Sequence, residues 1–330
     1  MKLKAKSPAI NLQQKGAALL IAMLTVAIVA TFSSAALWYQ WRAIEVEKAE
    51  RQRLQVGWML TGALDWSKLI LREDAKSGPV DHLGEPWALV LEESRLSTFL
   101  AADKNNTAVS LEDALDAFLS GHVIDAQSRL NLTNLIREAK ISEPDKANFK
   151  RLFTELKINP LELDILCDNL LASAVAKPES AIFEEVNLRP QRVRQLTWLG
   201  LKSSTISKLE PFITLLPNQT TVNLNTASAE VLHAVIPSLD MNSARQAVKI
   251  RENQPFQDLK QATEALKLGN NILNANIHSV GSNYFFVIGR MRIEETTIEE
   301  VSLISRQGRN AQTIWRDRGV LSADLAANLK

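Results

Sequence analysis

The chain has very few of the residues that build disulfide frameworks or metal centres. Among its 330 residues there is one cysteine, Cys167, so an internal disulfide and a four-cysteine zinc site are both excluded. Four histidines are scattered along the chain without the spacing of metal ligands, and we interpret each as an ordinary core or surface residue. They are His82, His122, His233 and His278.

An excess of charge of either sign is also missing. The 38 Lys and Arg residues nearly balance the 37 Asp and Glu residues, which gives a formal net charge of +1. This balance excludes a strongly basic nucleic-acid protein and an acidic disordered chain. The length predicts about two folding units.

Motifs of enzymatic chemistry are absent as well. The sequence contains no nucleophile elbow, phosphate-binding loop or metalloprotease signature. Glu162, Asp164 and Asp168 could be read as general acid–base groups, but acidic residues on one helix are more often a solvated face. We therefore predict that the protein is not an enzyme, while an enzyme with a membrane anchor stays as an alternative.

A long charge-free run near the N-terminus is the most informative feature that is present. Between Lys15 and Arg42 lie 26 consecutive residues without a charge and without proline. As a helix this run is roughly 39 Å long, more than a hydrocarbon core requires. Four lysines precede it, at positions 2, 4, 6 and 15, and the first acidic residue is Glu45. The positive-inside rule then predicts a cytoplasmic N-terminus, with the rest of the chain across the membrane.

A cleaved secretory signal peptide is the main alternative to this anchor. Ser34-Ala35-Ala36 offers a small-residue cleavage site, after which the chain would begin at Leu37. The apolar run is longer than a signal-peptide core, however, and helical sequence continues beyond it. We expect one helix from Ala17 to about Glu73, because no proline interrupts this stretch. Its outer part, residues 56–71, carries an apolar stripe that includes Val56, Leu60, Ala63 and Leu64.

The remaining sequence predicts strands at both ends of a helical region. Residues 79–90 read as a strand or loop with Trp87 as a core anchor, and residues 121–132 read as a strand. Helical patterns dominate from about 132 to 279, and three strands of a meander follow between 282 and about 319. This order indicates either one sheet with a helical insertion or two separate domains.

The residues Lys15-Gly16-Ala17 match a known pattern. A short basic leader, a glycine and an uninterrupted apolar helix resemble the class III signal of type IV pilins and type II secretion pseudopilins. Most of these proteins have glutamate at the fifth mature position, where this chain has Ile21. An apolar residue there is typical of the general secretion pathway protein K family, the large minor pseudopilins. The WRAIEVEKAERQRLQ, VDHLGEPWA, GHVIDAQSRLNLTNL and NLNTASAEVL segments extend the resemblance over nearly the whole chain.

The resemblance implies a fold and a division of the chain. The expected α+β fold is a pilin-like long N-terminal helix packed on a small antiparallel sheet, with a large helical domain inserted in the sheet. The expected parts are a leader at 1–16, a transmembrane helix at 17–41, a helix extension with the first strands at 42–131, the inserted domain at 132–281 and the closing strands at 282–330.

The resemblance also implies a function and partners. The family members cap the tip of the type II secretion pseudopilus and help to start its assembly for export of folded proteins. Prepilin peptidase is expected to cleave between Gly16 and Ala17, with possible methylation of the Ala17 amine. Other minor pseudopilins and the inner membrane are the expected partners, with the C-terminal part in the periplasm.

Calcium is a further implication of the resemblance, because family members carry it in the helical domain. Here the corresponding region offers Asp164, Asp168, Glu184 and Glu185, but the glycine, the tryptophan and much of the acidic run of the family pattern are missing. Calcium binding is therefore possible, through a degraded motif.

Residues 221–259 resemble a helix-hairpin-helix, a unit that many proteins use to bind DNA. We expect Asn225 or Thr226 to cap a first helix that ends at Pro237, and a second helix over 243–252. Five basic and five acidic residues between 221 and 267 make the unit neutral, and Asp240 stands near the would-be phosphate. We therefore expect a packing module and no nucleic acid, with a membrane-anchored DNA-uptake protein as the alternative.

Overall fold

The computed structural model describes residues 12–96, 117–175, 188–269, 271–293 and 296–319. Two compact units divide the chain, Met1–Trp58 and Met59–Lys330. One element, the helix α1 from Leu12 to Ser77, contributes to both. The expected single helix is thus confirmed, and it ends where Gly78 and Pro79 interrupt helical geometry.

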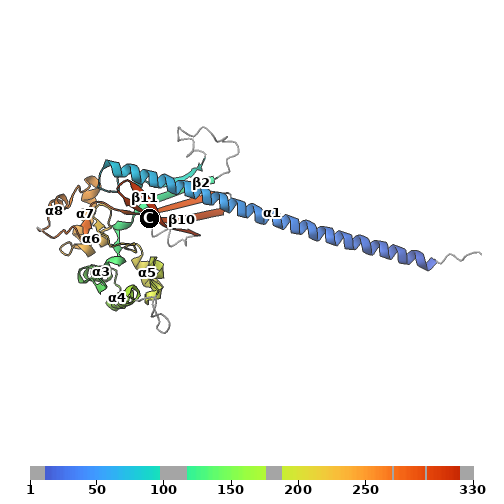
Figure 1. The fold of residues 1–330 in the computed structure, drawn as a ribbon, viewed down its shortest axis with the longest axis horizontal. Helices are drawn as coiled ribbons and strands as arrows, with labels where there is room; N and C mark the ends of the chain where they lie inside the picture. The colour runs from blue at the N-terminus through green and yellow to red at the C-terminus, as the bar shows by residue number, and fades with distance from the viewer. Residues whose placement is uncertain (1–11, 97–116, 176–187, 270, 294–295, 320–330) are drawn as a thin grey trace, which may run out of the picture. The chain divides into compact units, whose positions relative to one another are not determined.

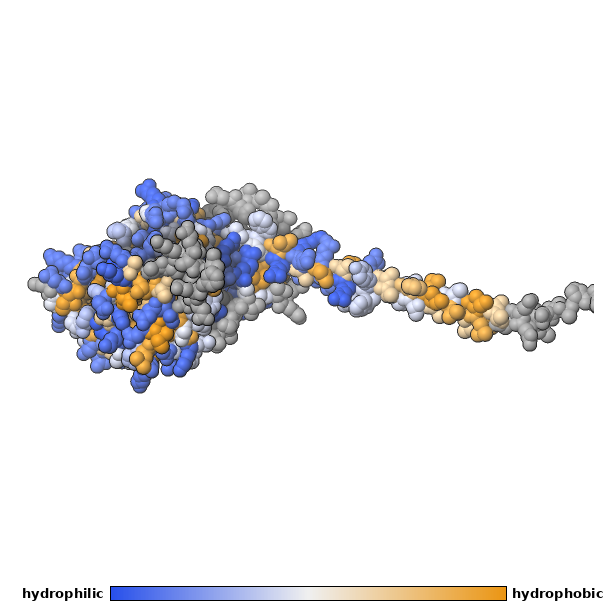
Figure 2. Space-filling model, turned by 60° about the horizontal axis from the view of Figure 1, so that its bottom comes forward, coloured by the Kyte–Doolittle hydropathy of each residue, from blue (hydrophilic) through white to orange (hydrophobic). Residues whose placement is uncertain are grey.

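The first unit consists, in the described part, of the N-terminal portion of α1. All of its residues from Ala17 to Arg51 are exposed. Figure 2 shows the apolar side chains gathered toward the N-terminal end of this helix, followed by hydrophilic ones. A helix that is apolar on every side has no solvent-facing stripe and belongs in an apolar environment.

The second unit is built around one antiparallel sheet (Figure 1). Its strands are β1 (Leu91–Arg95), β2 (Ala117–Asp125), β9 (Tyr284–Ile293), β10 (Thr296–Gln307) and β11 (Asn310–Gly319). They lie in the order β1-β2-β9-β10-β11. The pairing of β2 with β9, for example Asp125 with Phe285, makes one sheet of strands that are far apart in sequence. The insertion hypothesis is therefore right, and the two-domain alternative is wrong for the sheet.

The structure decides between the two alternatives for residues 79–90 and corrects the bounds of the second strand. Residues 79–90 form a loop and the short 3-10 turn η1 (Pro86–Ala88), which Gly84 and Pro86 favour over a strand. The strand β1 begins after this segment, at Leu91. The second strand starts at Ala117 and ends at Asp125, where the 3-10 turn η3 (Ala126–Ser128) begins.

One face of the sheet packs on the C-terminal part of α1. Leu64 and Leu71 of the helix share a core with residues on alternate positions of the strands, since successive side chains of a strand point to opposite faces. Trp87 joins them and meets Phe285 edge-on, with ring centroids 5.2 Å apart. The prediction that Trp87 anchors a core is confirmed, as the residue is 1% exposed. The other buried members of this core are Val287, Ile304 and Ala311.

The segment between β2 and β9 forms the helical insertion, gathered beside one end of the sheet (Figure 1). Its helices are α3 (Glu143–Glu155), α4 (Pro160–Val175), α5 (Ser203–Leu209), α6 (Ala229–Val235), α7 (Met241–Asn253) and α8 (Leu259–Ala265). The 3-10 helices η4 (Leu132–Leu135) and η6 (Val193–Leu199) accompany them.

Three two-stranded ladders tie loops of the insertion together. They pair β3 (Leu130–Asn131) with β6 (Ile213–Thr214), β4 (Ile136–Arg137) with β5 (Lys140–Ile141), and β7 (Val222–Asn223) with β8 (His278–Ser279).

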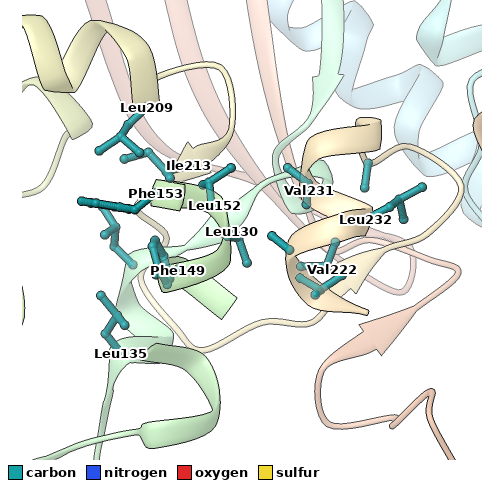
Figure 3. Close-up of a cluster of buried hydrophobic side chains, with 14 of the residues drawn as sticks. Leu130, Leu135, Phe149, Leu152, Phe153, Leu209, Ile213, Val222, Val231 and Leu232 are labelled. Carbon is teal, nitrogen blue, oxygen red and sulfur yellow. The ribbon is translucent and has the colours of Figure 1, made fainter. Parts of the chain in front are cut away.

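The insertion has its own hydrophobic core. Phe149, Leu152 and Phe153 of α3 share this core with Val231 and Leu232 of α6 (Figure 3). Cys167 lies within it, and burial raises the pKa of its thiol to about 11, so it is an inert core residue. The core of the insertion is therefore distinct from the core between α1 and the sheet.

Candidate functional site

The N-terminal part of α1 is the first candidate site. Within the part of the chain that the structure describes, this is the one helix that is long and apolar enough to cross a membrane, with a mean hydropathy of 2.2 in its most apolar stretch. Gly16 and Ala17, the expected processing residues, lie within this helix. Ile21 is 62% exposed, so no side chain among the described residues covers it. The cleavage, the methylation and the role of Ile21 stay predictions.

The helical hairpin is built differently from the expectation. Ser228, not Asn225 or Thr226, caps α6, by accepting a hydrogen bond from the Val231 amide. Asp240 caps α7 in the same way through the Ser243 amide, and this bond lowers the pKa of the Asp240 carboxyl. The predicted ends are confirmed, because α6 stops before Pro237 and α7 stops before Pro255.

Polar side chains of the hairpin bind backbone groups within the hairpin itself. Asn225 is buried and holds the backbone of Phe256 with two hydrogen bonds, of 2.9 Å each. Arg251 is 6% exposed and donates from Nη1 to the carbonyl of Leu224 at 2.6 Å. A side chain used in this way cannot at the same time neutralise a phosphate. The arrangement supports the hypothesis of a packing module.

A buried polar junction lies where the insertion meets the sheet. Asp81, Asp125, Asn223, Ser282 and Arg306 are each at most 5% exposed and bind one another directly. Ser282 Oγ donates to Asp125 Oδ2 at 2.6 Å, and Arg306 donates to Asp81. Sequence reasoning missed this junction, since its members lie up to 225 residues apart. Asp81, Asp125 and Asn223 stand within segments that carry the family resemblance, and this is the one signal that marked them.

Two of the four calcium candidates lie in the described part of the chain, and calcium binding by the full set stays a prediction. Asp164 and Asp168 are both exposed on α4, and Asp164 binds Lys146 Nζ at 2.7 Å. Glu184 and Glu185 lie outside the described residues. Calcium requires six to eight oxygen ligands, and two exposed carboxylates, one of them held by a lysine, do not supply them.

Another acidic group, Asp74, Asp81 and Glu85, brings carboxylate oxygens within 4.8 Å of one another. Arg306 binds two of its members, at 2.7 Å for Asp74, and therefore supplies a fixed positive charge where a metal ion would otherwise be needed. This group is part of the junction.

An apolar groove of about 350 Å³ runs between α1, the loop before β1 and the strands β2 and β9. Its floor contains Gly121 and Gly289, which face each other across the two strands. A Cβ atom on Gly121 would lie 2.5 Å from the Ile288 carbonyl oxygen, so glycine is required there. Trp66, Leu89 and Val90 line the groove and are 44%, 70% and 67% exposed. Such exposed apolar surface is typical of an interaction site.

The groove shows which part of the apolar stripe of α1 is accessible. Leu60 and Leu64 are 2% and 4% exposed, because the sheet already covers them. Ala63 is half-buried and lines the groove. Partners can therefore reach the flank of the stripe but not its centre.

This chain is similar to known proteins over most of its length. The family model described as "Type II secretion system (T2SS), protein K" matches residues 222–280, the region from β7 through the hairpin to β8. The type II secretion system protein K of Pseudomonas aeruginosa is 27% identical over 329 residues, with 93% of each chain covered. That of Pectobacterium carotovorum subsp. carotovorum is 24% identical, with 93% of this chain and 97% of the relative covered.

A solved structure shares the fold. A chain in the crystal structure of the GspK-GspI-GspJ complex from the enterotoxigenic Escherichia coli type 2 secretion system superposes with a TM-score of 0.64. The sequence identity is 17%, and the match covers 83% of this chain and 99% of that one. The α+β fold, a long helix and an antiparallel sheet with helices inserted, is therefore confirmed.

Proposed function

We propose that this chain is a member of the type II secretion system protein K family, a minor pseudopilin that caps the tip of the pseudopilus and starts its assembly. The observation that carries the proposal is the architecture: a charge-free helix that continues into a pilin-like sheet, with a helical insertion between β2 and β9. An insertion of this bulk suits the last position of a filament, where no subunit follows. We assign the protein no catalytic step.

The proposed location is the bacterial inner membrane, with a single pass. The exposed, apolar residues 17–41 supply the span, and the lysines before them keep the N-terminus cytoplasmic. The second unit then lies in the periplasm. Cysteine-labelling accessibility in intact cells tests this: a cysteine introduced in the second unit should react with a membrane-impermeant reagent once the outer membrane is opened. Protection of that cysteine in intact spheroplasts would contradict the orientation.

Processing by prepilin peptidase is the most direct test of the pseudopilin class. We expect the mature chain to begin at Ala17, because a basic leader and Gly16 precede an unbroken apolar helix. Mass spectrometry of the purified full-length protein gives the mature N-terminus and any methyl group on it. A bulky substitution at Gly16 should leave the leader attached. A mature chain that begins at Leu37 would indicate an ordinary signal peptide and would contradict the proposal.

The partners that we propose are two other minor pseudopilins, of the kinds named GspI and GspJ in the Escherichia coli complex. The groove beside α1 is the surface that we expect one of them to cover, since it is apolar and its rim is exposed. Ala63→Phe should fill the groove and weaken co-purification with the two pseudopilins. Ala172→Phe, the same change on an exposed position of α4, is the matched control.

DNA binding is the result that would reverse this assignment. The protein should not retain duplex DNA in a gel shift at physiological salt, since the hairpin carries no net charge and its arginine Arg251 is buried. Retention of DNA with a steep salt dependence, together with failure to bind either pseudopilin, would favour the uptake-protein alternative.

A further inference from the structure

The insertion is joined to the sheet at two points, and one carboxylate holds both. Asp125 is the last residue of β2, where the chain leaves the sheet, and Ser282 precedes β9, where it returns. Ser282 Oγ donates to Asp125 Oδ2 at 2.6 Å. Asn223 and Thr226 of the insertion donate to the same oxygen at 2.9 and 2.5 Å. Asp125 therefore ties together the outgoing strand, the returning strand and the insertion.

A second buried carboxylate, Asp81, completes this junction from the loop after α1. Its Oδ2 accepts the backbone amide of Ser282 at 2.7 Å, and its Oδ1 accepts a hydrogen bond from Arg306. The Asp81 amide donates to the carbonyl of Val280 at 2.9 Å. Asn223 Nδ2 also donates to the Asp81 carbonyl, at 3.1 Å. Both carboxylates thus bind Ser282, and the Asp81 amide binds Val280 of the same returning segment, residues 280–282.

The charges of the junction do not balance. Four acidic groups, Asp74, Asp81, Glu85 and Asp125, lie in the junction, and Arg306 binds two of them, Asp74 and Asp81, directly. His82 stands 3.8 Å from Glu85 at the rim, and Arg129 and Arg251 attract Asp125 from the insertion without a hydrogen bond to it in the described structure. Four ionised carboxylates in this setting would leave uncompensated buried negative charge, which is costly.

The titration of the two central carboxylates reflects this imbalance. Burial, with a contribution from the neighbouring Asp125, raises the pKa of Asp81 to about 7, although Arg306 acts in the opposite direction. Burial also raises the pKa of Asp125. The charge of Asp125 opposes ionisation of Asp81, so we assign the proton that Asp81 releases near neutral pH to the two carboxylates as a pair.

We propose that this junction is a proton-linked latch, which holds the inserted helical domain on the sheet while Asp81 and Asp125 share a proton and loosens when that proton leaves. The direction of the pH dependence follows from the linkage between proton binding and closure of the junction. The closed junction binds a proton that the open, solvated carboxylates release above about pH 4, so closure is favoured at mildly acidic pH and weakens as pH rises through about 7.

Hydrogen exchange of the full-length protein in detergent micelles tests the latch. Protection factors, corrected for intrinsic exchange, would be compared at pH 6 and pH 8 for peptides that cover residues 222–226 and 280–284. One proton with a pKa near 7 predicts about tenfold more opening at pH 8. Peptides from α3, which packs inside the insertion, serve as an internal reference and should change little.

Two variants and one control separate the latch from a general pH effect. Asp81→Asn and Asp125→Asn each remove one negative charge and should abolish most of the tenfold difference. Asp317→Asn, an exposed carboxylate on β11, should keep it. Equal protection of the wild-type junction at pH 6 and pH 8 would overturn the proposal, and so would loss of the difference in Asp317→Asn.

A spectroscopic measurement keeps the proposal testable even if both junction variants fail to fold. The wild-type protein at pH 6 should show the infrared carbonyl band of a buried protonated carboxylic acid, and this band should disappear by pH 8. Its absence at pH 6 would show that the carboxylates hold no proton and would overturn the latch.

Discussion

The two parts of α1 have similar apolar residues and opposite surroundings. In the first unit Phe32 is 72% exposed and Leu20 is 69% exposed, whereas in the second unit Leu71 is completely buried. The difference lies in the pattern: residues 17–41 are apolar on every side, while residues 59–77 alternate an apolar stripe with charged residues. A helix with one apolar stripe packs that stripe against one surface, here the sheet. A helix that is apolar on every side requires lipid around it.

The strongest test of this comparison removes a buried side chain. Leu71→Ala should lower the free energy of unfolding of the second unit by about 2–5 kcal/mol, because a fully buried leucine leaves a cavity. Denaturant unfolding of the full chain in micelles measures the change. Leu20→Ala in the anchor and Leu69→Ala, which is 49% exposed, should each change it by no more than about 0.5 kcal/mol. Equal losses at all three positions would contradict the division of the helix.

A charge placed in the anchor tests the other side of the comparison. Ile21→Glu should weaken membrane insertion or assembly at a cost on the order of 2–3 kcal/mol, since it adds an uncompensated carboxylate to an apolar environment. Leu69→Glu, at an exposed position of the second unit, should leave insertion unchanged. Carbonate extraction of membranes and pulldown of the partner pseudopilins report the two effects. Unchanged extraction, pulldown and secretion in Ile21→Glu would show that the apolar residue has no assembly role.

The smallest expected effect is a gain in stability. Gly62 is exposed on α1 with open space around its α-carbon, so Gly62→Ala should raise the free energy of unfolding by about 0.5–1 kcal/mol through helix propensity. Gly281→Ala should do the opposite, because the new Cβ atom would lie 2.1 Å from the Pro79 carbonyl oxygen. Thermal unfolding of both variants measures the contrast. A loss of stability in Gly62→Ala would mean that this position is packed.

Local pattern predicted much of the fold. The absence of proline predicted α1 almost to its end, and alternation predicted the three closing strands β9, β10 and β11. The strand β1 escaped prediction because its sequence, Leu91-Glu-Glu-Ser-Arg95, lacks alternation and sits at the sheet edge. The cap at Ser228 was misplaced because Asn225 and Thr226 have the same capping chemistry, and the fold uses them elsewhere.

The candidate sites also divide into those that the local sequence pattern predicts and those that it does not. The anchor is a local property, so length, charge and hydropathy were sufficient to find it. The groove was not predictable, because it depends on Gly121 facing Gly289, a pairing that the sheet register decides. The junction depends on contacts such as that of Asp81 with Arg306, across 225 residues. No local pattern records such a contact.

The sequence by itself determined that one end of this protein is an anchor, since 26 residues without a charge have one stable environment. It also determined which segments become helix or strand, because periodicity is a local property. The tertiary structure alone decided which apolar residues of α1 remain exposed, which glycines line the groove and which carboxylates are buried together. Burial and charge imbalance arise from distant parts of the chain brought into contact, and they exist only after the insertion has closed on the sheet.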